Sequence, residues 1–176
     1  MADTTDHTAD GLYDRLSHLL GGATAWLVYL MAAITVSVVV LRYILGEGSI
    51  ALQESITYIH AAHFMLGASY ALKRGAHVRV DVFYIRMSPI AQAWIDCLGT
   101  LVFLLPMSIF TSWMSVDYVA SSWQIREGSP DPGGLPIVYL LKTLIPIMGV
   151  CLVIEAISQL TGNTRRLLTL LEKSHG

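Results

Sequence analysis

Charged side chains are scarce in this sequence. Only 14% of the 176 residues are Asp, Glu, Lys or Arg, whereas 54% are hydrophobic. This balance is far more apolar than a soluble domain of this length needs. The formal net charge is -2, and no Lys/Arg cluster with interleaved aromatic residues is present, so the sequence offers no electrostatic footprint for nucleic acid. We therefore expect a membrane protein that has the lipid bilayer, and no nucleic acid, as a partner.

Residues with catalytic or ligating chemistry are also few. The only two cysteines, Cys97 and Cys151, lie in apolar stretches without the spacing of a zinc or redox site, so we interpret them as core residues. No arrangement resembles a nucleophile with its base, no Gly-rich loop follows a strand, and no H-E-x-x-H motif occurs. The sequence predicts no enzyme activity, no metal site and no cofactor.

Four apolar segments are long enough to cross a bilayer, because about 20 residues of helix span a hydrocarbon core of about 30 Å. Pro106 and Pro146 fall inside the third and fourth segments and predict local kinks there. Between the second and third segments, Val78, Val82 and Ile85 recur at helical spacing, which favours a short helix in the membrane interface. Val78, Val80 and Val82 also alternate with a period of two, so the run fits an extended segment as well. The predicted fold is an all-α membrane protein forming a single membrane domain over residues 1–176, with spans at about 20–45, 51–72, 91–117 and 135–160 and an interfacial segment at about 76–88.

Lys and Arg are distributed unequally between the two sides of this predicted topology. With four spans, the two termini and the connection between the second and third spans share one side. That side carries eight basic residues, and the other carries three: Arg15, Lys73, Arg74, Arg79, Arg86, Arg165, Arg166 and Lys173 against Arg42, Arg126 and Lys142. The positive-inside rule then predicts that both termini are cytoplasmic. The turn-rich stretch from Ser121 to Pro136 would face outward.

Two histidines lie near the middle of the second predicted span. His60 and His63 are three residues apart and therefore share one helix face. They could form a proton relay or a ligand pair, or they could be neutral imidazoles that hydrogen-bond to neighbouring helices. We favour the structural interpretation because no other histidine is predicted at that depth.

Charged residues near the outer ends of the spans need partners, because an unpaired charge is costly in a membrane. Glu54 opens the second span, and Lys142 lies about two turns into the fourth. Arg42, at the outer end of the first span, is a rival partner for Glu54. We hypothesise that Glu54 pairs with one of these two cations and so fixes the packing of the helix ends.

Three places in the sequence carry a resemblance to a known family. The most specific is the segment from Lys73 to Asp81, which is similar to a basic-Gly-x-His-x-x-x-Asp pattern and supplies Gly75, His77 and Asp81. Glu54 stands where the family has an acidic residue at the start of the second helix. The stretch from Glu127 to Pro136, which contains Gly134, resembles the outer loop of one branch of that family, and Lys142 follows it.

On these residues, the chain resembles the small four-helix (DctQ-type) subunit of tripartite ATP-independent periplasmic (TRAP) transporters, over roughly residues 12–160. The resemblance implies a bacterial inner-membrane complex in which a large membrane subunit carries substrate and sodium. A periplasmic substrate-binding protein would deliver the substrate, typically a carboxylate. The small subunit would brace the large one and would hold no cofactor itself, since sodium coupling is expected in the larger partner. The resulting structural or interface candidates are Glu54, Lys142, Arg42, His60, His63, Gly75, His77, Asp81, Gly134 and Pro136.

A different class of protein, the four-helix membrane anchor of a redox enzyme complex, is the alternative hypothesis. Such an anchor would need axial histidines on different helices. The sequence places His60 and His63 on one helix, which favours the transporter subunit.

Overall fold

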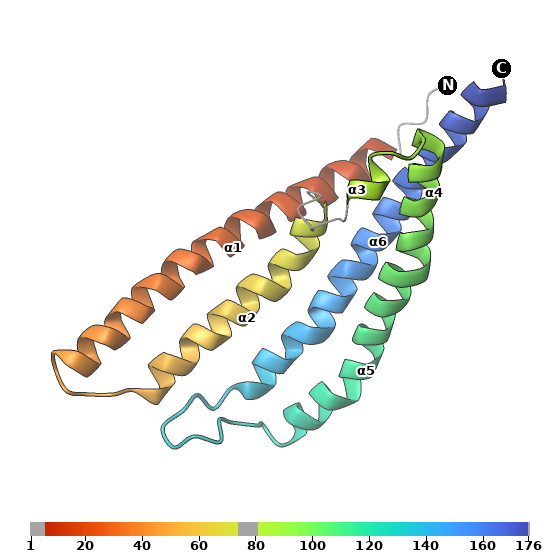
Figure 1. Ribbon diagram of the computed structural model, residues 1–176. Coiled ribbons are helices and arrows are strands. Elements are labelled where there is room, and N and C mark those ends of the chain that lie inside the picture. The colour runs from red at the N-terminus through yellow and green to blue at the C-terminus, as the bar shows by residue number, and fades with distance from the viewer. Residues whose placement is uncertain (1–5, 74–80, 176) are drawn as a thin grey trace. The chain divides into compact units, whose positions relative to one another are not determined.

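The regular elements of the structure are helices. The computed structural model describes the backbone of residues 6–73 and 81–175, and no strand occurs within those ranges. The chain order is shown in Figure 1: α1 (Asp6–Tyr43), α2 (Ile50–Lys73), α3 (Asp81–Tyr84), α4 (Pro89–Gly99), the π-helical turn η1 (Thr100–Leu104), α5 (Leu105–Gln124) and α6 (Val138–His175). The all-α prediction is confirmed for these residues.

Three helical stretches in the described part of the chain are long and apolar enough to cross a membrane: Trp26–Tyr43, Pro89–Gln124 and Val138–Lys173. Helix α2 has 24 residues, which is sufficient length, but it is not among these three. Glu54, His60 and His63 interrupt its apolar residues and lower its hydropathy. The span predicted there therefore stays a prediction.

The chain divides into two compact units. The first comprises Met1–Tyr70 and Asp117–Leu144, and the second comprises Ala71–Val116 and Ile145–Gly176. Helices α2, α5 and α6 each contribute residues to both units.

Helices α4, η1 and α5 follow one another without a break. The π-helical turn ends at Leu104, two residues before Pro106. The N–H of Leu105, the first residue of α5, donates to the carbonyl of Thr100, five residues back. Proline has no N–H of its own, so the normal hydrogen-bond ladder cannot continue through it, and a π-helical turn is one way to absorb this defect. At the start of α4, the hydroxyl of Ser88 accepts from the N–H of Ala91 and caps the helix.

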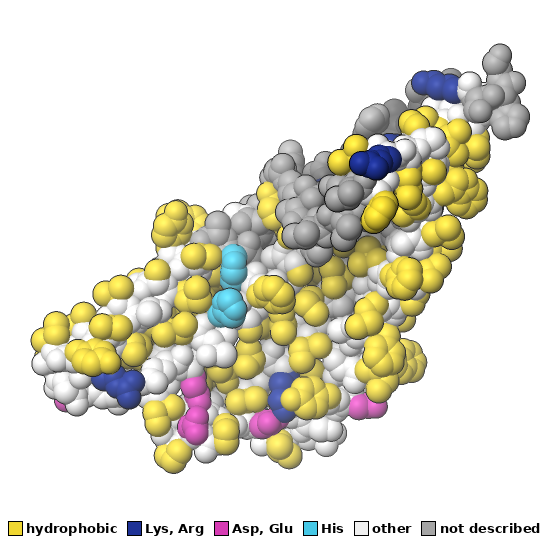
Figure 2. Space-filling model, viewed as in Figure 1, with side chains coloured by type: hydrophobic (Ala, Val, Ile, Leu, Met, Phe, Trp, Pro, Cys, Tyr) yellow, Lys and Arg dark blue, Asp and Glu magenta, His cyan; other side chains and the backbone are white. Residues whose placement is uncertain are grey.

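Side-chain burial along this continuous helix is the reverse of that in a soluble protein. The buried positions are small and often polar, as at Ser108, Ser115 and Ser122, whereas Phe103 and Trp113 are highly exposed. The buried hydroxyls of Ser108 and Ser115 donate to carbonyls of their own helix, so they need no water. Figure 2 shows the same pattern as hydrophobic side chains spread over the visible helix surfaces. Such a helix is suited to hydrocarbon surroundings.

Packing in the second unit explains why α6 continues to His175, beyond the predicted end near residue 160. Ala93 and Cys97 of α4 form a buried cluster with Leu167 of α6, and Leu170 and Leu171 pack against it. The leucines recur at helical spacing and so extend the helix. The interpretation of Cys97 as a core residue is confirmed. Cys151 is half-buried.

The interfacial helix predicted at about 76–88 lies partly outside the described residues. Within them, α3 has only four residues. It is followed by turns in which the Arg86 N–H donates to the carbonyl of Phe83 and the Met87 N–H to that of Tyr84. A longer interfacial helix stays a prediction.

Candidate functional site

The richest set of polar contacts in the first unit surrounds the loop that joins α5 to α6, residues 125–137, hereafter the α5–α6 loop. It is closed by two backbone hydrogen bonds, from the N–H of Ser129 to the carbonyl of Leu135 (2.9 Å) and from the N–H of Gly134 to the carbonyl of Asp131 (2.9 Å). Gly133 has a φ of 82°, a left-handed conformation that glycine adopts without steric cost. The three prolines in the loop, Pro130, Pro132 and Pro136, restrict it further. The α5–α6 loop therefore has one well-defined shape.

Glu54 ties this loop to α2. Its Oε1 accepts a hydrogen bond from the hydroxyl of Ser129, and its Oε2 accepts one from the backbone N–H of Leu135 at 2.6 Å. Ser129 and Leu135 are also hydrogen-bonded to each other where the two sides of the loop meet, hereafter the neck of the loop. One carboxylate therefore binds both sides of this neck. Hydrogen bonds to an ionised acceptor are the strong ones. The chain thereby satisfies the charge of Glu54 with uncharged donors.

Gly134 makes this grip possible. A Cβ placed on Gly134 would lie 2.5 Å from Cβ of Ser129 and 2.6 Å from Oε1 of Glu54. Both distances are far inside van der Waals contact, so a side chain at this position would displace Ser129 or Glu54. Gly134 is needed here for close approach rather than for an unusual φ.

A second carboxylate, Glu127, ties the loop to α5 and α6. Its Oε2 accepts from Nζ of Lys142 at 2.5 Å and from the hydroxyl of Ser122 at 2.6 Å. The ammonium of Lys142 and, after it, the hydroxyl of Ser122 lower the pKa of Glu127 below its ordinary value. Nζ of Lys142 also lies 4.1 Å from the ring centroid of Tyr118, within range of a cation–π interaction.

Aromatic contacts join the ends of the same helices. The indole Nε1 of Trp123 donates to the hydroxyl of Thr143 at 2.9 Å, and the rings of Trp123 and Tyr139 pack edge to face with centroids 4.7 Å apart. The end of α5 and the start of α6 are thus held together both by ring packing and by Glu127. In Figure 2, separate acidic side chains lie along the lower edge of the visible face, near the start of α2, the end of α5 and the start of α6.

The predicted pairing of Glu54 with Lys142 or Arg42 is wrong. Lys142 is taken by Glu127, and Arg42 is exposed at the end of α1, with no ion pair joining it to Glu54 among the described residues. The prediction compared helix depths alone, whereas the α5–α6 loop brings its own carboxylate to Lys142 and its own donors to Glu54. Glu127 was noticed only as part of the family resemblance, because its role depends on the path of the loop.

Of the remaining sequence-predicted candidates, Pro136 belongs to the α5–α6 loop, and the others lie elsewhere in the chain. The Cα of Pro136 lies 3.4 Å from where a Cβ on Gly128 would stand, so the proline packs at the neck of the loop. His60 is exposed on α2, and His63 is half-buried one turn further on. Gly75 and His77 lie outside the described residues, and Asp81 begins α3, with its side chain also outside them. No group of three or more His, Cys, Asp or Glu that could hold a metal is found in the described part of the chain.

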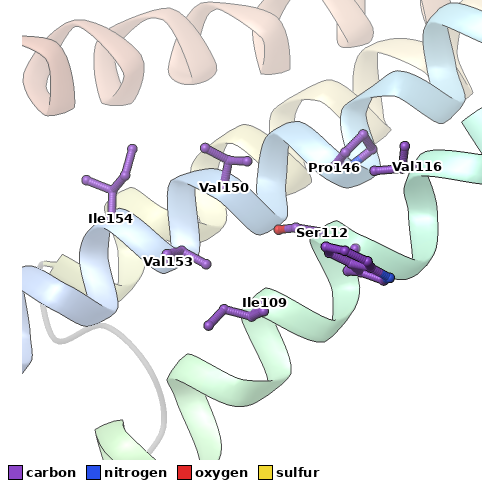
Figure 3. Close-up of a pocket in the computed structure, with 8 residues that line it drawn as sticks. Ile109, Ser112, Val116, Pro146, Val150, Val153 and Ile154 are labelled. Carbon is purple, nitrogen blue, oxygen red and sulfur yellow. The ribbon is translucent and has the colours of Figure 1, made fainter.

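The second unit contains an open apolar groove of about 340 Å³ between α5 and α6. Figure 3 shows Ile109, Ser112 and Val116 of α5 on one side of the groove, and Pro146 and Val153 of α6 on the other. The hydroxyl of Ser112 donates to the carbonyl of Ser108, so it is already used within α5. The groove has no titratable side chain in its lining and offers no chemistry of its own.

Long apolar helices, large exposed hydrophobic side chains and buried small polar residues define a multi-pass helical membrane protein. Residues 31–166 match the model of the family described as tripartite ATP-independent periplasmic transporters, DctQ component. The chain belongs to this family, as its sequence motifs indicate. The match includes α2, the α5–α6 loop and both loop-binding carboxylates. A search of curated proteins found no match, and a search of solved structures found none.

Proposed function

We propose that this chain is the scaffold subunit of a sodium-coupled, binding-protein-dependent transporter that imports a carboxylate across a bacterial inner membrane. The DctQ component of such transporters works with a large membrane subunit and a periplasmic binding protein. In this proposal, the large subunit carries the substrate and sodium, and this chain is not an enzyme and holds no cofactor.

The observation that supports the scaffold role is that the carboxylates of Glu54 and Glu127 fix the α5–α6 loop to three helices. Glu54 binds the α5–α6 loop from α2, through the hydroxyl of Ser129 and the N–H of Leu135. Glu127 belongs to the loop and binds Ser122 of α5 and Lys142 of α6. Each carboxylate is engaged in holding the loop. Charged groups used in this way build a rigid surface rather than a path for ions.

The proposal includes α2 as a fourth span, with Glu54 at its outer end. A carboxylate that accepts two hydrogen bonds is far less costly near a membrane boundary than a bare one. Ser49 begins the helix by accepting from the N–H of Leu52, so the chain enters α2 through a capped start. Both histidines of α2 would then lie within the membrane.

The orientation of the chain in the membrane is a further part of the proposal. The excess of Lys and Arg at the termini and in the connection after α2 supports cytoplasmic termini and an outward-facing α5–α6 loop. Asp131→Cys is a suitable probe because the Asp131 side chain is exposed, whereas Ser129 is occupied by Glu54. The introduced cysteine should react with an impermeant thiol reagent in intact cells, and Lys173→Cys should react only after lysis. The unchanged protein controls for Cys97 and Cys151, and the reverse pattern would refute this orientation.

The redox-anchor alternative has no support from the family match, which describes a transporter component. His60 and His63 lie on one helix, α2. Two axial ligands must approach a haem from opposite faces, which these two side chains on one helix cannot do for the same haem.

The decisive experiment is reconstitution of transport in sealed vesicles. With a sodium gradient, carboxylate uptake should require this chain, a large subunit of the same transporter and the soluble binding protein together. Uptake by this chain alone, or equal uptake when it is left out, would overturn the scaffold role.

A matched pair of variants tests the carboxylate grip itself. Glu54→Gln should reduce the amount of large subunit that co-purifies, because the amide cannot accept from both Ser129 and Leu135. Glu47→Gln removes an exposed carboxylate from the connection before α2 and should leave co-purification unchanged. If Glu54→Gln assembles normally but abolishes uptake, the carboxylate acts in transport rather than in bracing.

A further inference from the structure

The connection between α3 and α4, in the second unit, presents large apolar side chains to its surroundings. Phe83 and Ile85 are 70% and 73% exposed, and Met87 is also exposed. Phe83 lies in α3, and Ile85 and Met87 lie in the turn that follows it. Figure 1 shows this connection from α3 into α4. Exposed apolar residues that cluster on a short segment mark a surface for lipid or for another protein.

Hydrogen bonds fix which side of this connection faces outward. The hydroxyl of Tyr84 donates to Oδ2 of Asp96 on α4 at 2.7 Å. From the same helix, the amide of Gln92 donates to the carbonyl of Tyr84 at 3.0 Å. Tyr84 is therefore held against α4, and the side chains on either side of it, Phe83 and Ile85, are exposed. The exposure of these two residues is a built feature rather than the result of a loose turn.

Basic side chains accompany the apolar ones. Arg86 stands between Ile85 and Met87 and is exposed. In residues 83–99 and 161–173, the basic groups outnumber the acidic ones: Arg86, Arg165, Arg166 and Lys173 against Asp96 and Glu172. Asp96 is occupied by Tyr84 and lies 3.8 Å from Arg166. This end of the second unit is thus both apolar and positively charged.

We propose that the 83–88 connection is a lipid anchor that inserts Phe83, Ile85 and Met87 into a membrane leaflet and binds the phosphate of an anionic phospholipid through Arg86. Segments with apolar side chains on one side and arginine beside them bind at the boundary between headgroups and acyl chains. An anionic leaflet attracts basic residues near its surface. Trp94 of α4, also exposed, belongs to a residue type enriched at that boundary. The inference requires only that the chain spans a membrane and does not rest on the transport role.

The chain contains a matched control for this anchor. Ile125 and Arg126, after α5, repeat the dipeptide of Ile85 and Arg86, and Ile125 has the same 73% exposure. Their region carries Glu127 and Asp131, so it lacks the net positive charge of the anchor. Equal substitutions at the two places separate a specific lipid contact from a general effect of losing one arginine.

The first measurement is lipid retention by native mass spectrometry. The full-length chain is reconstituted in phosphatidylcholine with about one third phosphatidylglycerol and extracted gently. Arg86→Gln should lower the retention of phosphatidylglycerol about fivefold, which corresponds to the contribution of one basic residue near an anionic surface. Arg126→Gln should leave it unchanged. Equal retention in all three proteins, or equal loss in both variants, would overturn the proposal.

The second measurement is insertion depth. A fluorescent thiol probe on Phe83→Cys should be quenched by lipids brominated on their acyl chains, whereas a probe on Asp131→Cys should be quenched by aqueous iodide. The unchanged protein, labelled in parallel, accounts for Cys97 and Cys151. Quenching of the Phe83→Cys probe by iodide alone would show that the segment lies in water. Loss of bromine quenching when a large membrane subunit is added would assign this surface to a protein partner. Either result would refute lipid insertion.

Discussion

Gly149 is the position where the packing of α5 against α6 can be tested most directly. It is buried on α6, and a Cβ added there would lie 3.0 Å from the backbone nitrogen and 3.2 Å from the Cα of Ser112 on α5. Ser112 points toward α6 in Figure 3. Because the closest obstacles include backbone atoms, no change of side-chain rotamer can relieve the contact.

The expected cost follows from these distances. Non-bonded carbon atoms are most stable at about 3.5–4.0 Å, so Gly149→Ala requires α5 and α6 to separate locally by about 0.5 Å. Overpacking of this kind costs about 1–3 kcal/mol. For a chain of this length, that corresponds to a Tm lower by roughly 2–12 °C. Thermal unfolding of the purified protein in detergent, followed by tryptophan fluorescence, measures this shift.

Gly162→Ala is the control for this prediction. Gly162 lies on the same helix with no atom within 4 Å of the added Cβ, so alanine should be neutral or stabilising by up to about 1 kcal/mol. Adding Ser112→Gly to Gly149→Ala should restore little stability, because the backbone of residue 112 remains in place. Wild-type stability of Gly149→Ala, with Gly162→Ala behaving as expected, would refute the close approach of the two helices.

Three further predictions concern hydrogen bonds. Tyr84→Phe should lower the Tm because it removes the hydrogen bond to Asp96. Tyr58→Phe should leave the Tm unchanged, because the buried Tyr58 hydroxyl has no hydrogen-bond partner among the described residues. Equal losses of Tm in the two variants would contradict this prediction. Because the pKa of Glu127 is lowered in the folded protein, its stabilising effect should be complete at neutral pH. It should be lost as the pH falls below about 4.3, the ordinary value for glutamate, through the lowered pKa. Hydrogen exchange of the α5–α6 loop should show this loss in the wild type and not in Glu127→Gln. Gly134→Ala should accelerate hydrogen exchange in the same loop at neutral pH, and unchanged exchange rates would mean that the neck of the loop can accommodate a side chain.

Much of the helical framework could be predicted from the sequence because lipid imposes a simple rule. A chain that cannot hydrogen-bond to its solvent must form long helices, and uninterrupted apolar runs reveal them. The first, third and fourth predicted spans correspond to α1, the continuous helix from α4 to α5, and α6. The extension of α6 was missed because Leu167 is buried against α4, and only tertiary packing decides whether a helix continues into such a region.

The site was harder to predict than the helices. The need of Glu54 and Lys142 for partners was visible from the cost of charge in a membrane. Their actual partners depend on the path of the α5–α6 loop, which turns at Gly133 and brings Leu135 and Glu127 to the helix ends. No periodicity describes such a path. Gly134 illustrates the difficulty. Glycine is required there because a side chain would collide with Glu54, which lies 80 positions earlier in the sequence.

The fixed shape of the α5–α6 loop has a consequence for the strength of recognition. Ordering a flexible segment on binding costs conformational entropy, and this cost weakens the complex. Prolines and two carboxylates have already ordered this loop, so a protein that docks on it would lose little further freedom there. Such a partner could bind through a small contact area, because the loop need not be ordered anew at each association. Loosening the loop through Glu54 or Gly134 would then weaken docking without altering any residue on its exposed surface.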